Sequence, residues 1–369
     1  MTMTLSLYIT RRFLRSMVMV TLVIGGIAAL ISGVENLRYA ASKDASVALA
    51  GALTLFQMPE VMGQTFPLIL MLASLITFLN LSRTSEMVIV RASGVSALRI
   101  LVLPVAVAAL LGGVATTIYN PIMAASMERE SALRAAMSGT QVSAMSVNEG
   151  GLWLRQGLPS GQTVIQARRA SEEGSVLYGA RLHQFDPDDR LVARIEADSA
   201  TLSKDAWILL GVRRWTVGGG AEGAPIGAPE ELSQLRLPTN LTREQILDSF
   251  AAPETIPFWK LPAFIERLEQ AGFSATRHRV FLHTELARPA LFIAMVLIGA
   301  GFSLRHVRFG QVGVMILFAV FAGFSLYFFI DIARTLGSNG EIPVVLAAWS
   351  PPAAAILLAL GLLLHLEDG

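Results

Sequence analysis

Residues 17–34 read MVMVTLVIGGIAALISGV and contain no charged side chain. Residues 100–119, ILVLPVAVAALLGGVATTIY, form a second uncharged stretch. A helix rises about 1.5 Å per residue, so each stretch is long enough to cross the roughly 30 Å hydrocarbon core of a bilayer. The sequence therefore predicts a membrane protein with helical spans.

The composition of the whole chain agrees with this prediction. Its 369 residues are 53% hydrophobic and 15% charged, with a mean hydropathy of +0.56, whereas soluble domains carry about 25% charged residues. The net charge of +1 gives no signal for a polyanionic partner. Because the chain has no cysteine, disulfides, thiol chemistry and cysteine-ligated metals are excluded.

Six apolar segments predict six spans, three on each side of a long polar insert. This pattern divides the chain into a first membrane half (1–119), an inserted domain (120–275) and a second membrane half (276–369). The predicted spans cover residues 16–34, 53–81, 98–119, 280–304, 311–334 and 343–365.

Arginines near the span ends predict the orientation, because Lys and Arg concentrate in short cytoplasmic loops. They precede the first span and lie between the second and third and between the fourth and fifth. We therefore expect both termini in the cytoplasm and the insert outside, in the periplasm of a Gram-negative cell. The residues concerned are Arg11, Arg12, Arg15, Arg83, Arg91, Arg99, Arg305 and Arg308.

The insert has the pattern of a β domain. In residues 191–197, Leu191, Ala193 and Ile195 alternate with polar side chains, which is typical of a half-buried strand. Several short strands at such spacing predict a sandwich or a jelly roll. Residues 258–272 predict an amphipathic helix that either closes the domain or lies on the membrane surface. Further strands are expected at 152–156, 162–168, 175–185 and 206–217.

The segment between the second and third spans is unusual. Residues 85–94 read SEMVIVRASG, which predicts a short cytoplasmic helix within residues 84–97. An exposed Met/Val/Ile face needs a partner surface, although such a helix could also lie flat on the membrane. The residues expected to contact a partner are Ser85, Glu86, Met87, Val90, Arg91 and Gly94.

Three polar residues share one face of the second predicted span: Gln57, Glu60 and Gln64. A carboxylate in hydrocarbon is costly and normally faces protein or water. The three residues could form the wall of a polar cavity, or a cluster of hydrogen bonds between helices.

Catalytic motifs are absent from the sequence. It contains no GxxxxGK[ST], HExxH or GxSxG pattern, and its five histidines are not spaced as metal ligands. We therefore expect no catalytic site and no metal site, and an energy source in another subunit or an ion gradient.

Four stretches resemble one known family. They are YITRRFL (8–14), SEMVIVRASG (85–94), PFWKLP (257–262) and HLEDG (365–369). With the three-plus-three spans and the insert, they make the chain similar to the LptF/LptG (YjgP/YjgQ) family of lipopolysaccharide export permeases, and most like LptG. The resemblance implies a membrane α-helical fold of six transmembrane helices with an inserted periplasmic all-β jellyroll domain.

The resemblance also implies function and partners. Members of the family form the permease of an ABC exporter that extracts lipopolysaccharide from the outer leaflet of the inner membrane. The expected partners are an LptF-like paralogue, an LptB-like ATPase dimer that uses ATP and grips a coupling helix, and LptC-like and LptA-like jellyroll proteins. No cofactor is expected on this chain. Basic residues that would meet lipid A phosphates are Arg38, Lys43, Arg129 and Arg134.

Other interpretations remain open from the sequence. The chain could be the LptF paralogue, or a permease for another lipid or a lipoprotein. A non-transporting scaffold is disfavoured by the exposed cytoplasmic helix, and a membrane enzyme by the missing catalytic groups.

Overall fold

The computed structural model describes residues 2–84, 86, 96–138, 146–148, 151–158, 161–171, 175–217, 228–239, 252–303 and 312–368. These residues form two compact units. The helical unit comprises Met1–Gly139, Pro257–Trp259 and Thr276–Gly369, and the sheet unit comprises Thr140–Ile256 and Lys260–Ala275.

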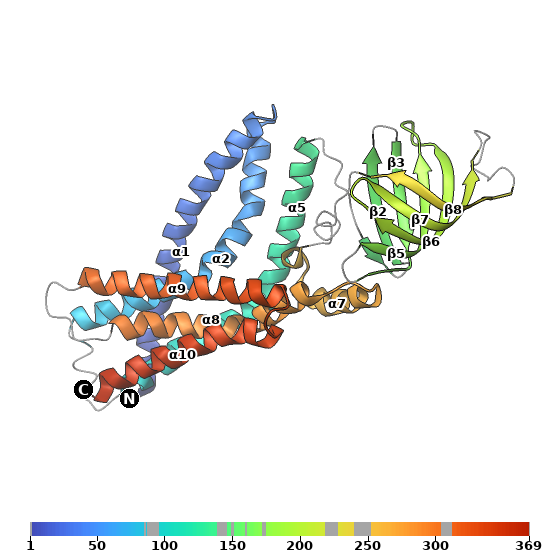
Figure 1. Cartoon of the computed structure of the whole chain (residues 1–369). Helices are drawn as coiled ribbons and strands as arrows, with labels where there is room; N and C mark the ends of the chain where they lie inside the picture. Colours follow the sequence, from blue (N-terminus) through green and yellow to red (C-terminus); the bar gives the residue numbers. More distant parts are fainter. Residues whose placement is uncertain are drawn as a thin grey trace. The chain divides into compact units, whose positions relative to one another are not determined.

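The predicted six spans are confirmed, since six helices of the described chain are long and apolar enough to cross a membrane. Both ends of the chain lie at the same end of the helical unit (Figure 1). The helices are α1 (Thr2–Ala41), α2 (Val47–Arg83), α4 (Ala97–Val114) continued by the π-helix η1 (Ala115–Tyr119) and α5 (Asn120–Ser138), α8 (Thr276–Ser303), α9 (Val312–Ser338) and α10 (Val344–Asp368).

The third span is longer than the apolar pattern indicates. The helix runs through residue 120 and ends at Ser138, so the compact sheet unit begins at Thr140 and not at 120. Residues 120–138 read NPIMAASMERESALRAAMS, rich in Ala, Met, Glu and Arg. These residues favour helix strongly, so the helix continues after the apolar stretch has ended.

Small residues bring α2 and α8 close together. A Cβ on Gly299 would lie 2.9 Å from the Cβ of Ser74 and would clash with the carbonyl oxygen of Met71. The Ser74 hydroxyl donates to the carbonyl of Val296 (2.7 Å), and the Ser303 hydroxyl to that of Leu75 (3.2 Å). Small residues and side-chain hydrogen bonds are what hold helices together in lipid, where burial of apolar surface gives no net drive.

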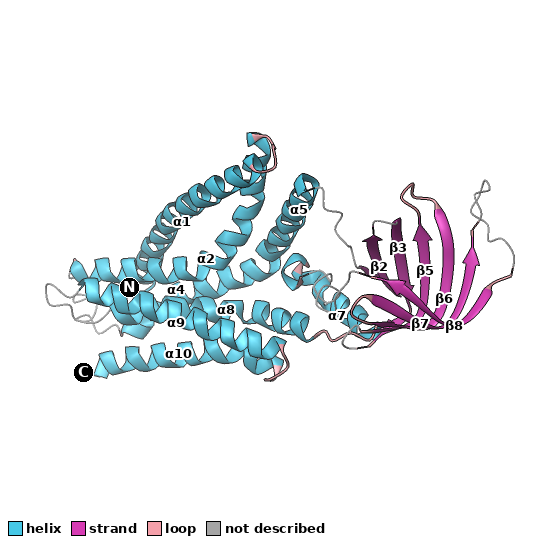
Figure 2. Cartoon of the chain, turned by 45° about the horizontal axis from the view of Figure 1, so that its top comes forward, coloured by secondary structure: helices cyan, strands magenta, loops and turns pink. Residues whose placement is uncertain are grey.

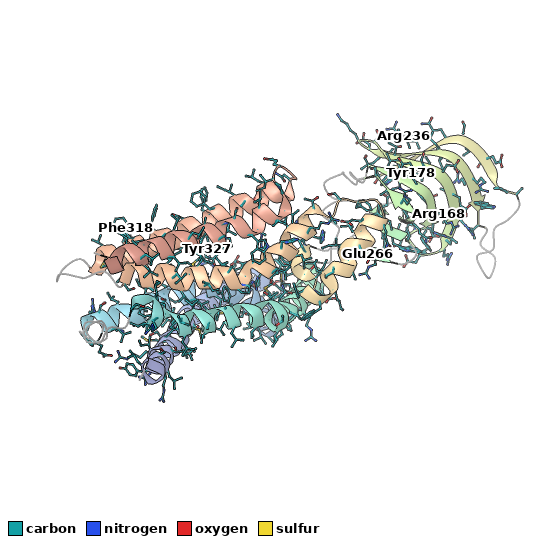
Figure 3. All side chains as sticks on the ribbon, turned by 90° about the horizontal axis from the view of Figure 1, so that it is seen from below. Arg168, Tyr178, Arg236, Glu266, Phe318 and Tyr327 are labelled. Atoms are coloured by element: carbon teal, nitrogen blue, oxygen red, sulfur yellow. The ribbon has the colours of Figure 1, made fainter. Side chains whose placement is uncertain are left out.

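The helices differ strongly in how much of their surface the chain itself covers. In the most apolar stretch of each span, only 11% of the residues of the first span and 17% of those of the fifth are buried, against 61% in the second and 56% in the fourth. Phe318 on α9 (Figure 3) is one of these uncovered side chains. The exposed apolar side chains of α1 and α9 include Val18, Leu22, Val23, Ile27, Leu30, Ile31, Leu317, Phe318, Phe321, Phe324 and Phe328.

The described strands of the insert form one antiparallel sheet, which is strongly curved (Figure 2). The strand order is β1-β2-β3-β5-β6-β7-β8, so sequence neighbours pair except that β3 pairs with β5, and the short β4 also pairs with β5. The strands are β1 (Ser146–Asn148), β2 (Gly151–Leu158), β3 (Gly161–Ala167), β4 (Arg169–Ala170), β5 (Val176–Phe185), β6 (Leu191–Leu202), β7 (Ala206–Thr216) and β8 (Glu230–Pro238).

A buried amide joins β2 to the end of β8. Gln156, 2% exposed, donates through Nε2 to the carbonyl of Pro238 (3.3 Å) and accepts from the Thr239 hydroxyl (2.7 Å). Because these strands are far apart in the sheet order, the contact shows that the sheet curves back on itself. Inward side chains such as Ile195 and Trp207 fill the resulting core.

The alternation of inward and outward side chains shifts at one level of three adjacent strands. Gly179 on β5 and Gly211 on β7 have φ of 62° and 63°, a left-handed conformation that suits glycine. β6 lies between these two strands, and the carboxylate of its Asp198 is so close to Gly211 that a Cβ on Gly211 would clash with it. Such irregularities bend strands and increase twist, so their alignment contributes to the curvature.

The amphipathic helix α7 (Leu261–Gln270) belongs to the sheet unit. Its apolar residues Leu261, Ile265 and Leu268 are buried, and the amide of Ala170 on β4 donates to the carbonyl of Ala271 (2.8 Å). Of the two interpretations of this segment, the structure favours a helix that closes the sheet domain.

Charged residues gather on the outward face of β5, β6 and β7. Glu196 accepts hydrogen bonds from Arg194 (2.7 Å) and Arg213 (3.3 Å), and Arg181 lies 3.7 Å away. The hydrogen bond from Arg194 holds the pKa of Glu196 below its usual value. Burial lowers the pKa of the neighbouring His183, and Arg194 and Arg181 lower it further.

Acidification is therefore expected to destabilise the sheet unit in two steps. Because the folded state lowers the pKa of His183, the unfolded chain binds more protons below pH 6.5 and stability falls there; loss of the Glu196 contribution follows below pH 4.5. Thermal unfolding of the full chain in detergent between pH 7.5 and 5.5 should show the first step. His183→Gln should flatten it, whereas His283→Gln, in α8, should not. An equal slope in both variants would contradict the assignment.

Candidate functional site

Asn36 connects three helices near the end of α1. It is 1% exposed, and its Nδ2 donates to Oε1 of Gln57 (2.9 Å) and to Oγ1 of Thr54 (3.2 Å), both on α2. Its Oδ1 accepts from Nη2 of Arg134 on α5 (3.1 Å). We call Asn36, Thr54, Gln57, Glu130 and Arg134 the Asn36 cluster.

Arg134 is held within the chain from several sides. Its Nε donates to Oε1 of Glu130 (2.8 Å), one turn earlier on α5, and its guanidinium lies 5.0 Å from the centre of the Tyr39 ring. Its charge is therefore largely balanced by Glu130. Arg129 is different, because it is exposed: its guanidinium lies 5.8 Å from the centre of the Phe56 ring, and it forms no ion pair with a described residue.

Arg38 and Lys43 stand apart from this cluster. Arg38 follows the buried Asn36 by two positions, which places it on the opposite side of α1, and it is exposed. Lys43 is exposed in the turn between α1 and α2. Within the described part of the chain, neither side chain forms an ion pair. The structure thus brings Arg134 and Gln57 together but does not gather the four predicted basic residues.

Glu60 and Gln64 form a separate pair one and two turns further along α2. Nε2 of Gln64 donates to Oε1 of Glu60 (3.1 Å). Two tyrosine hydroxyls donate hydrogen bonds to carbonyls of α2. Tyr119 donates to the carbonyl of Pro59 (2.8 Å), and Tyr327 (Figure 3) donates to that of Gln64 (2.6 Å). Each tyrosine hydroxyl thereby finds a backbone acceptor within the helical unit, as polar groups in lipid require.

A cavity of about 270 Å³ lies between α1, α2, α4, η1 and α8. Arg288 contributes its one charged group, and Gln57, Glu60 and Gln64 do not line it. Arg288 is hydrogen-bonded to the fully buried Glu285, three residues earlier on α8. Because buried charges are stable only when paired, this ion pair accounts for the presence of Glu285. For Gln57 the structure shows interhelical hydrogen bonding.

Most of the expected coupling segment lies outside the described residues: Ser85, Met87, Val90, Arg91 and Gly94. Its flanks are described. α2 ends at Arg83, and Ser96 caps the start of α4 by accepting a hydrogen bond from the amide of Arg99 (3.3 Å).

Glu86 is also described, and it contacts the beginning of α1. Its carboxylate accepts hydrogen bonds from Arg12 (3.1 Å), Tyr8 (3.2 Å) and Thr84 (2.9 Å).

Sequence reasoning missed Asn36, Thr54 and Glu130. The available signal was weak: Asn36 is a single amide just after the first apolar stretch, and nothing local indicates that residues 54 and 134 approach it.

These features define a multi-pass membrane protein with two groups of three spans and a curved antiparallel sheet inserted between them. A family model described as "Lipopolysaccharide export system permease LptF/LptG" matches residues 7–365. The chain therefore belongs to the LptF/LptG family of permeases. It is 22% identical to the lipopolysaccharide export system permease protein LptG of Escherichia coli K12 over 367 residues, covering 97% of each chain. It is 23% identical to LptG of Haemophilus influenzae over 374 residues, covering 99% of each chain.

Proposed function

We propose that this chain is the LptG-like subunit of an ABC exporter that extracts lipopolysaccharide from the outer leaflet of the inner membrane. The curated relatives described above carry the name LptG, and the PFWKLP stretch at 257–262 and the ending HLEDG favour LptG over LptF. As a permease, the chain itself is not an enzyme, and a partner ATPase supplies hydrolysis.

The observation that carries this proposal is the uneven burial of the spans. α1 and α9 leave most of their apolar surface uncovered by the chain. α9 also borders an apolar groove of about 680 Å³. A second, LptF-like subunit facing these two helices would enclose a cavity whose walls suit acyl chains. Lipid would enter laterally between α1 of one subunit and α9 of the other.

The proposal also includes the orientation of the chain in the membrane and the path of the lipid after it leaves the cavity. Because Lys and Arg concentrate in short cytoplasmic loops, both termini would lie in the cytoplasm and the sheet unit in the periplasm. There the curved sheet receives lipid and passes it to LptC-like and LptA-like jellyroll proteins. β1 and β8 are the outer strands of the described sheet, and an unpaired strand edge can pair with a strand of another protein.

On the cytoplasmic side, residues 84–97 would bind an LptB-like ATPase dimer. Such a contact uses the apolar residues Met87 and Val90 as its centre and Arg91 at its rim. Glu86, whose carboxylate accepts hydrogen bonds from Tyr8, Arg12 and Thr84, would hold the start of this segment and would not be a main contact of the ATPase. ATP binding would draw the two ATPases together and narrow the lipid cavity.

The lipid phosphates would meet the exposed cations at the outer ends of α1 and α5. Arg38, Lys43 and Arg129 have guanidinium or ammonium groups that no described carboxylate neutralises. Arg134, bonded to Glu130 and Asn36, would act mainly by holding α5 against α1. Gln57, Glu60 and Gln64 would contribute polar groups to the wall of the lipid cavity near these cations.

The different roles proposed for Arg129 (phosphate contact) and Arg134 (holding α5 against α1) predict different results when each is substituted. Arg129→Ala should reduce lipopolysaccharide photocrosslinking to the chain by about tenfold, because one charge-assisted contact contributes about 1.5 kcal/mol, without changing the melting temperature. Arg134→Ala should lower the stability of the helical unit by about 1–2 kcal/mol, because it leaves Asn36 and Glu130 without their partner. Crosslinking yield and thermal unfolding of purified protein measure the two effects. Identical behaviour of the two variants would contradict the separate roles proposed for Arg129 and Arg134.

The whole proposal is tested by purifying the tagged chain from its native membrane and identifying proteins and lipids by mass spectrometry. A stoichiometric ATPase, a homologous six-span partner and bound lipopolysaccharide would support it. An ATPase recovered with a different lipid would change the substrate. Recovery without any ATPase would overturn the transporter assignment for this chain.

A further inference from the structure

The beginning of the segment after α2 is fastened to the beginning of α1. Arg12 Nη1 donates to Oε1 of Glu86 (3.1 Å), and the Tyr8 hydroxyl donates to Oε2 (3.2 Å). The Thr84 hydroxyl also donates to Oε1 (2.9 Å). The guanidinium of Arg12 lies 4.9 Å from the centre of the Tyr8 ring, so the two donors support one another. Both carboxylate oxygens of Glu86 are thus occupied within the chain.

This part of α1 is firmly seated in the helical unit. Ile9 and Phe13, which flank Arg12, are 1% and 0% exposed, and the Thr77 hydroxyl of α2 donates to Ser16 (3.0 Å). From Val18 onward many apolar side chains of α1 are exposed, although Val20 is buried and Asn36 ties the far end of the helix to α2 and α5. α1 therefore has a seated base, which holds Glu86, and a middle portion with a largely exposed apolar face.

We infer that Arg12 and Tyr8 are positioning residues: they set the start of the coupling segment against α1, so that a movement of this segment is transmitted directly to α1. The inference rests on the proposed function. Among the described residues, the other connections of the segment to the bundle are its covalent neighbours, α2 and α4. With the contact to Glu86, the helix that leaves most of its surface for lipid and for a second subunit receives the movement as well.

The alternative is an ordinary surface ion pair. The side chains of Arg12 and Glu86 are 36% and 31% exposed, and exposed pairs add little to stability. The two interpretations predict different results, because a positioning contact changes the coupling between sites while leaving the melting temperature nearly unchanged. Arg11 and Arg15 provide matched controls on the same helix, since both are exposed and neither forms an ion pair with a described residue.

The test is a charge reversal in the full chain, assembled with its partner subunit and ATPase in vesicles of phospholipid and lipopolysaccharide. ATP hydrolysis is measured together with ATP-dependent crosslinking of lipopolysaccharide to a photoreactive residue at Leu191 in the sheet unit. R12E should lower the lipid crosslinked per ATP about fivefold while hydrolysis persists. R12E combined with E86R should recover at least half of the loss, and R11E should have no effect.

A double reversal that performs no better than E86R alone would overturn the inference, because Glu86 would then act through another partner. Equal loss in R12E and R11E would do the same, since bulk charge would explain it. A cysteine pair, R12C with E86C, tests the contact itself because the chain has no other cysteine; failure of a short bifunctional reagent to link it would remove the contact. Absence of ATP-dependent lipid crosslinking in the unaltered chain would instead refute the proposed function, and the inference with it.

Discussion

Gly112→Val is expected to destabilise the helical unit by about 3 kcal/mol, whereas Gly113→Val should be nearly neutral. A Cβ on Gly112 would lie 2.8 Å from the nitrogen of Pro289 on α8 and would clash with its Cα. The backbone of α8 cannot move aside at this point, because the Thr116 hydroxyl donates to the carbonyl of Glu285 (2.8 Å) one turn earlier. Overpacking a close helix crossing forces the backbones apart and costs about 1–3 kcal/mol or more.

Gly113 is a matched control, because a Cβ there meets no atom within 4 Å. Both variants make the same change in helix propensity and hydropathy, so a difference between them reports the crossing of α4 and α8 alone. The measurement is thermal unfolding in detergent, with the folded yield after extraction from the membrane as a second readout. Equal losses in the two variants would show that α4 and α8 do not pack as described.

Asn36→Leu is expected to cost about 2–4 kcal/mol and to loosen α5 from α1. The substitution removes one hydrogen-bond partner from each of the Gln57 amide, the Thr54 hydroxyl and the Arg134 guanidinium. Thr54 keeps its bond to the carbonyl of Ala50, and Arg134 keeps its ion pair with Glu130. Each polar group left buried without a partner costs about 1–3 kcal/mol, and more if it is charged. Lipid cannot replace these hydrogen bonds as water could.

The control is Glu35→Leu, which places the same side chain on an exposed neighbouring position of α1. Unfolding in detergent should distinguish the two, and cysteine accessibility of a probe on α5 should rise only in Asn36→Leu. In the Asn36→Leu background, Arg134→Leu should cost less stability than it does alone, because the hydrogen bond between Asn36 and Arg134 is already lost. Full tolerance of Asn36→Leu would show that the Asn36 cluster is not a structural connection.

Prediction from sequence succeeded where the signal is local and periodic. Uncharged stretches such as 17–34 and 100–119 had to be spans, because an unsatisfied backbone in lipid is too costly for any other structure. The alternation from Leu191 to Ala197 correctly predicted β6, because inward and outward side chains alternate along any half-buried strand. The end of the third span was wrong because α5 continues on helix propensity after its hydrophobicity has ended.

The candidate sites could be predicted only in part. Gln57 and Arg134 were chosen separately as polar residues in or near spans, and the structure joins them through Asn36, which no pattern singled out. Arg38 and Arg134 looked equivalent as basic residues, but Arg38 lies on the side of α1 opposite Asn36, to which Arg134 is hydrogen-bonded. A sequence gives the number and sign of the charges, but not which of them are already neutralised by a partner.

The sequence by itself determined the class of this protein: six spans, an inserted β domain, and no catalytic motif. These properties follow from hydrophobicity and turn chemistry over short windows, so they need no knowledge of distant contacts. Tertiary structure alone decided the polar connections. Arg134 meets Asn36 across 98 positions of sequence, and Arg12 meets Glu86 across 74. Such pairs form because helix packing brings particular faces together, and packing depends on the shape of the whole unit.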